Sequence, residues 1–148
     1  MPWSDAAAAV GQQTAHVAAT PMLAGLQPLL VRLNNTKRMR SVDEPTRSVA
    51  ARNFARAWRD LAAGADVEAV AWREAAAAMS TVVLGAIDAA SLRRAGLAED
   101  AVHTTLCTAI VNAGDALTPA VLQRLTAAVP ALVSCASKPF APAPRFVE

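Results

Sequence analysis

Apolar residues recur at every third or fourth position along most of the chain, which is the spacing of an amphipathic helix. The longest such stretch covers residues 67–94 and carries polar residues on its opposite side. Its apolar stripe consists of Trp72, Ala76, Met79, Val83, Ile87 and Ala90. We expect this helix to lie at the centre of the fold, with Gly85 as a weak point because glycine is a poor helix former.

Capping residues divide the rest of the chain into further helices. A short polar side chain before a helix satisfies a free backbone N–H, and a glycine after it adopts the left-handed backbone that ends the helix. The start signals are Ser4, Thr20, Asp66 and Thr118, and the stop signals are Gly64, Gly96 and Gly114. The predicted helices cover residues 5–19, 21–33, 45–63, 67–94 and 98–113, and a sixth begins at 118–119. Residues 36–44 form a polar loop.

Two prolines fall inside these predicted helices, where proline lacks a backbone donor and crowds the preceding turn. We expect Pro28 to kink or split the second helix. Pro130 is expected to form a bend on the outer side of the sixth helix.

The composition favours an all-α protein. Hydrophobic residues make up 54% of the chain, a quarter of all residues are alanine, and tyrosine is absent, whereas sheets draw on β-branched and aromatic residues. We predict a compact bundle of five to six helices with mostly antiparallel neighbours, forming a single domain over residues 1–137 and followed by an extended proline-rich tail over residues 138–148. The predicted core contains Trp58, Trp72, Met79, Val83, Leu106, Ile110, Leu122 and Leu125.

The cellular location of the protein is predicted from signals that its sequence lacks. The first residues show no export signal, and the longest uncharged stretches are too polar or too short to span a bilayer. Two cysteines are too few for a disulfide framework. These observations predict a cytoplasmic protein that does not associate with membranes.

Charge is concentrated in one segment. Residues 32–59 hold eight basic and two acidic side chains, a local charge of +6 in a chain whose net charge is +2. On the predicted third helix, three arginines fall within a band of roughly 60°, opposite an apolar side that includes Phe54, Trp58 and Leu61. We therefore expect the arginines to face outward. The predicted basic face consists of Lys37, Arg38 and Arg40 from the preceding loop and Arg52, Arg56 and Arg59 from the helix.

This basic face is either an ordinary solvated helix surface or a binding surface. Arginine suits carboxylates and phosphates, and a net charge of only +2 is low for a nucleic-acid-binding protein. The leading prediction is a non-enzymatic interaction module, an adaptor or regulatory subunit that binds a larger acidic protein. The alternatives are nucleic-acid binding through the same arginines, and a small helical enzyme that holds an anionic metabolite with buried arginines. In the tail, Phe140 and Phe146 are candidate anchors, either on a partner or on this domain.

Other candidate chemistry is sparse. His103 and Cys107 lie one helical turn apart, and Cys135 could approach them as a third metal ligand or as the partner of Cys107 in a disulfide, but buried structural roles are favoured. No cofactor, metal site or catalytic residue is predicted. The 98–113 helix carries an uncharged polar side that either packs on another subunit or is covered by a helix of the same chain. A homo-oligomer through this helix is one prediction.

Overall fold

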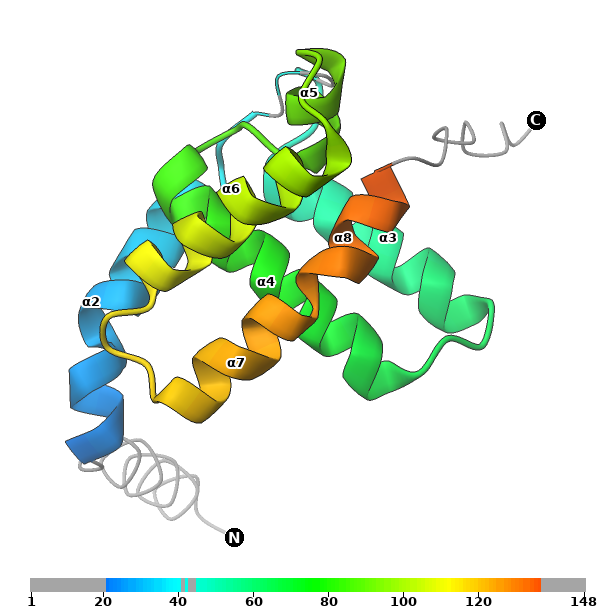
Figure 1. The fold of residues 1–148 in the computed structure, drawn as a ribbon. Coiled ribbons are helices and arrows are strands. Elements are labelled where there is room, and N and C mark those ends of the chain that lie inside the picture. The colour runs from blue at the N-terminus through cyan, green and yellow to red at the C-terminus, as the bar shows by residue number, and fades with distance from the viewer. Residues whose placement is uncertain (1–20, 41, 43–44, 137–148) are drawn as a thin grey trace, which may run out of the picture.

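A computed structural model describes residues 21–40, 42 and 45–136 of the chain, and the predicted first helix and proline-rich tail lie outside them. Its elements are helices (Figure 1), and one antiparallel bridge pairs Arg40 with Ser48 in the connection before the helix that begins at Val49. The all-α prediction is therefore confirmed. The helices are α2 (Pro21–Thr36), α3 (Val49–Ala62), α4 (Val67–Leu84), α5 (Ala89–Arg94), α6 (Glu99–Ala113), α7 (Pro119–Ala127) and α8 (Val129–Ala136).

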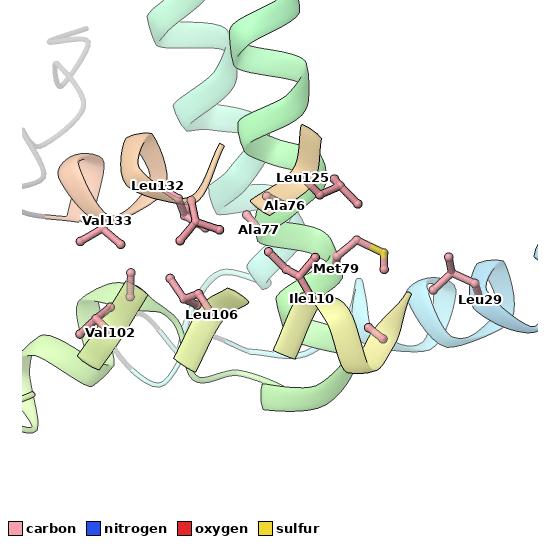
Figure 2. Close-up of a cluster of buried hydrophobic side chains, with 13 residues drawn as sticks. Leu29, Ala76, Ala77, Met79, Val102, Leu106, Ile110, Leu125, Leu132 and Val133 are labelled. Atoms are coloured by element: carbon pink, nitrogen blue, oxygen red, sulfur yellow. The ribbon is translucent and has the colours of Figure 1, made fainter. Parts of the chain in front are cut away.

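Helix α4 lies at the centre of the bundle, as predicted. It packs against α2, α3, α6, α7 and α8, and Figure 1 shows it crossing the middle of the molecule. Alanines at its buried positions let neighbouring helices approach closely, so larger side chains from α6, α7 and α8 fill the space between them (Figure 2). The largest side chains that are fully buried in the core are Leu106, Ile110, Val102, Val129 and Val133.

The predicted 67–94 helix is divided in two at Gly85. This glycine has a φ of +63°, which side chains with a Cβ rarely adopt, and it ends α4. Asp88 then starts α5 by accepting a hydrogen bond from the backbone N–H of Ser91. Because α4 ends at Gly85, the apolar stripe is interrupted there, and Ile87 beyond the break is 43% exposed. Val83 is 45% exposed, so its predicted place in the core is wrong.

The prolines are accommodated differently from one another. Pro28 lies inside the continuous helix α2, and the residue after it, Leu29, is buried in the core. Pro130 lies in the first turn of α8, where the missing N–H has no helical partner to lose. The predicted sixth helix is consequently two helices, α7 and α8, that meet at Ala128.

The stretch Pro119–Ala136 has a mean hydropathy of 1.3 and is, by length and composition alone, able to cross a membrane. In the structure it is bent into α7 and α8, and Leu125, Val129 and Leu132 bury their side chains in the core. A core helix of a globular protein meets the same criterion. Cytoplasmic location and the lack of membrane association stay predictions.

Candidate functional site

Helix α3 has the opposite orientation to the one predicted. Its aromatic side faces outward, with Phe54 70% and Trp58 67% exposed, and its polar side faces α4. The assignment of Trp58 to the core is therefore wrong. We call the exposed apolar side the α3 outer face, which consists of Ala50, Ala51, Phe54, Trp58 and Ala62.

Arg56 pairs with Glu74 of α4 through two hydrogen bonds. Its Nε lies 2.9 Å from Oε1 and its Nη2 lies 2.6 Å from Oε2. Arg73 of α4 binds the same carboxylate, with Nη2 2.7 Å from Oε1, and also places Nη1 2.7 Å from Oδ2 of Asp60 on α3. Arg56, Asp60, Arg73 and Glu74 thus form one α3–α4 ion network.

Arg52 forms a second ion pair, with Asp88, which ties α3 to the start of α5. The side chains of Arg52 and Arg56 are only 13% and 17% exposed, so the prediction that they face outward is wrong. Arg59 is different, since its side chain is 52% exposed and its Nε lies 3.4 Å from Oδ1 of Asp60.

The physical reason for this orientation lies on α4. Arg73 is buried there, and a buried guanidinium needs carboxylates to offset the loss of its hydration. Only the polar side of α3 carries one, Asp60, and the same side brings Arg56 to Glu74. Turning the aromatic side inward would leave Arg73 without Asp60.

The pairing is reflected in the protonation of the network. Burial alone would raise the pKa of Asp60, but its hydrogen bond with Arg73 and the charges of Arg73 and Arg59 hold that pKa below its usual value. Burial alone would lower the pKa of Arg73, but its hydrogen bonds to Glu74 and Asp60 raise it. Both groups are therefore held in their charged forms.

This arrangement predicts a loss of stability in acid. The pKa of Asp60 is lower in the folded state, so its contribution is complete above the unfolded-state pKa and is lost as the pH falls through the folded-state pKa. Urea unfolding of the wild type and an Asp60→Asn variant, measured from neutral to strongly acidic pH, should show a stability difference that shrinks in acid. A difference that stays constant would contradict the role of the ionised carboxylate.

The loop before α3 carries the other predicted basic residues. Lys37, Arg38 and Arg40 are exposed, and the Nη1 of Arg40 lies 2.8 Å from the carbonyl oxygen of Pro45. The loop is fastened to the start of α3, because the N–H of Val49 donates to the carbonyl of Met39 at 2.8 Å and Arg40 bridges to Ser48. We call Lys37, Arg38 and Arg40 the basic loop. It lies beside the N-terminal end of the α3 outer face.

The two aromatic side chains on the α3 outer face lie against one another. The rings of Phe54 and Trp58 are stacked, with their centroids 6.4 Å apart and their planes at 14°. Neighbouring exposed alanines extend the apolar area along the helix. Monomeric soluble proteins rarely expose contiguous apolar patches of more than roughly a few hundred Å², and larger patches mark sites of interaction.

The cysteines do not come together at a site. The Sγ of Cys107 lies 3.8 Å and 3.9 Å from the ring nitrogens of His103, and burial raises the pKa of its thiol. The Sγ of Cys135 instead accepts a hydrogen bond from Nη1 of Arg73 at 3.4 Å. Neither cysteine forms a disulfide. Among the described residues, no three His, Cys, Asp or Glu side chains are grouped to hold a metal ion.

Two further surfaces were predicted, one on α6 and one in the proline-rich tail. On α6, Thr104, Thr108 and Asn112 are exposed, and Val111 between them is 51% exposed. Association through this helix stays a prediction. Phe140 and Phe146 lie outside the described residues.

The α3 outer face is the functional candidate that the sequence interpretation missed. A usable signal was present, since Asp60 and Asn53 share the arginine side of α3, and Arg73 interrupts an alanine-rich helix that should be central. A buried arginine in that position requires acidic partners from a neighbouring helix.

No protein-family model, curated protein or solved structure matches this chain.

Proposed function

We propose that the protein is a non-enzymatic interaction module that binds an acidic, amphipathic segment of a partner protein on the α3 outer face. One observation carries this proposal: a strongly amphipathic helix turns its apolar side, with Phe54 and Trp58, to solvent. Exposing such a side costs hydrophobic free energy in the isolated chain, and a docking partner recovers it.

The residue types on this face are those that dominate protein–protein binding. Tryptophan is enriched among residues whose removal weakens a complex most, and an aromatic side chain buries roughly 150–250 Å² when covered. Phe54 and Trp58 lie one helical turn apart, so a partner helix laid along α3 would meet both with anchors spaced at three or four residues.

Charge around the face favours an acidic partner. The basic loop lies at one end of α3, and Arg59, with its half-exposed side chain, lies in the second half of the helix. Opposite charges on a partner would be attracted before contact and would fix its register. A second copy of this chain would bring the same positively charged residues to the interface, so it lacks the charge complementarity that an acidic partner has.

The two alternative functions lose their main support. Arg52 and Arg56 are paired with carboxylates of the same chain, so their guanidinium groups are engaged before any phosphate or anionic metabolite arrives. Nucleic-acid binding would then depend mainly on the basic loop, which does not use the exposed aromatic rings. An acidic protein partner uses both features.

Affinity capture followed by titration tests the proposal. A partner recovered with the wild type is identified, purified and titrated against wild type, against Phe54→Gln/Trp58→Gln and against the matched control Val67→Gln/Val111→Gln. The control removes two apolar residues that are 69% and 51% exposed on other helices. We expect the aromatic variant to weaken binding at least about 100-fold and the control to leave it unchanged.

Charge is tested in the same titration. Reversing Lys37 and Arg38 to glutamate should weaken binding about tenfold at low salt and less at high salt. Equal binding by the aromatic variant and the control would refute the α3 outer face as the docking site. A partner captured through DNA or RNA, and lost after nuclease treatment, would instead support nucleic-acid binding.

A further inference from the structure

The end of α8 lies next to α3, on the side away from the α3 outer face. Arg73 touches both elements, since its Nη1 lies 3.4 Å from Sγ of Cys135 near the end of α8 and 2.7 Å from Oδ2 of Asp60 on α3. One side chain therefore separates the last turn of α8 from α3. The chain that follows Ala136 starts beside the helix whose other side carries Phe54 and Trp58.

The segment 137–148 is long enough to pass over α3. Phe140 is four residues beyond Ala136, which is roughly 13 Å of extended chain, and Phe146 is ten residues beyond it, roughly 33 Å. A helix with its side chains is about 10–12 Å across. Pro139, Pro142 and Pro144 favour an extended backbone, which provides reach at a low entropic cost. Phe146 is therefore within reach of the α3 outer face, and Phe140 lies on the path over α3 towards it.

We propose that segment 137–148 docks on the α3 outer face of its own chain through Phe140 and Phe146, and that the acidic partner must displace it. The short connection gives the segment a high effective concentration at this face, which a second copy does not have. The segment carries Lys138, Arg145 and Glu148, so its net charge is +1 and the basic loop does not attract it. Apolar contact alone holds it, which leaves an acidic partner the stronger ligand.

Only the displacement step rests on the proposed function. Docking of the segment is a property of the isolated chain, and it is measured without a partner. The two ideas can therefore fail separately.

Docking is tested by the accessibility of Trp58 in the full-length protein. Trp3→Phe and Trp72→Phe leave Trp58 as the sole tryptophan, and circular dichroism checks that each variant is folded. In this background we compare acrylamide quenching with and without Phe140→Ala/Phe146→Ala, with Val147→Ala as the matched control in the same segment. We expect the double phenylalanine variant to raise the quenching constant at least about twofold and to shift the emission to the red, because the ring becomes hydrated.

Three outcomes separate the occupants of the face. Equal quenching in all variants overturns the proposal. Protection of Trp58 that grows across about a hundredfold range of protein concentration assigns the face to a second copy and also overturns it. Protection that is independent of concentration and lost only with the phenylalanines supports it.

The link to function is tested with the purified partner. If the segment leaves the face free in about one molecule in ten, Phe140→Ala/Phe146→Ala should bind the partner about tenfold more tightly than the wild type. A change in quenching without any partner binding sinks the proposed function and leaves the docking intact. Partner binding with unchanged quenching supports the proposed function and refutes docking of segment 137–148.

Discussion

Replacing Arg73 with methionine is expected to lower the free energy of unfolding by about 3 kcal/mol. The Arg73 side chain is only 8% exposed and is the central cation of the α3–α4 ion network. Methionine keeps most of the apolar stem but removes the charge that lies between Asp60 and Glu74. Among the described residues, Asp60 would then keep the weaker contact with Arg59, and Glu74 would keep Arg56.

Urea unfolding at neutral pH measures this loss, and thermal unfolding should show a midpoint lower by roughly 10 °C. Arg124→Met is the matched control, because Arg124 also pairs with a glutamate, Glu68 at 2.9 Å, but its side chain is 63% exposed. Exposed pairs contribute about 1 kcal/mol or less. Equal losses for the two variants would show that Arg73 is not a buried cation.

The second large effect is expected at the arginines of α3. Replacing both Arg52 and Arg56 with methionine should lower the free energy of unfolding by about 3 kcal/mol, because each change breaks a partly buried ion pair to another helix. Glu74 keeps Arg73, and Asp88 keeps its hydrogen bond to the N–H of Ser91, so the loss for each arginine is smaller than for Arg73. The same urea titration measures it. An unchanged midpoint would mean that these arginines extend into solvent.

Much of the fold could be predicted because helix boundaries depend on local chemistry. Asp66 and Thr118 start α4 and α7 as expected, and the side chain of each accepts a hydrogen bond from a backbone N–H. Glycines follow several helix ends. The all-α class and the central place of α4 followed from the spacing of apolar residues. These features need only a few neighbouring residues to act.

The orientation of α3 could not be predicted from its own sequence. Amphipathicity alone places Phe54 and Trp58 in the core, because burial of apolar surface is usually the largest favourable term. The deciding interaction is non-local, since Arg73 lies on a different helix from Asp60 and is satisfied only when the polar side of α3 faces it. The candidate site follows from this orientation. Because the α3–α4 ion network occupies the side of α3 that faces α4, the apolar side of α3 is left as the exposed α3 outer face.

Comparing two double variants in urea unfolding tests this orientation most directly. Phe54→Gln/Trp58→Gln should lose no more than about 2 kcal/mol, because neither ring packs among the helices of the core and docking of segment 137–148 contributes only about a factor of ten, whereas Arg52→Met/Arg56→Met should lose about 3 kcal/mol. If the aromatic variant instead loses more than about 5 kcal/mol, as two core aromatics would, and the arginine variant loses nothing, then α3 packs with its apolar side inward and the account is contradicted.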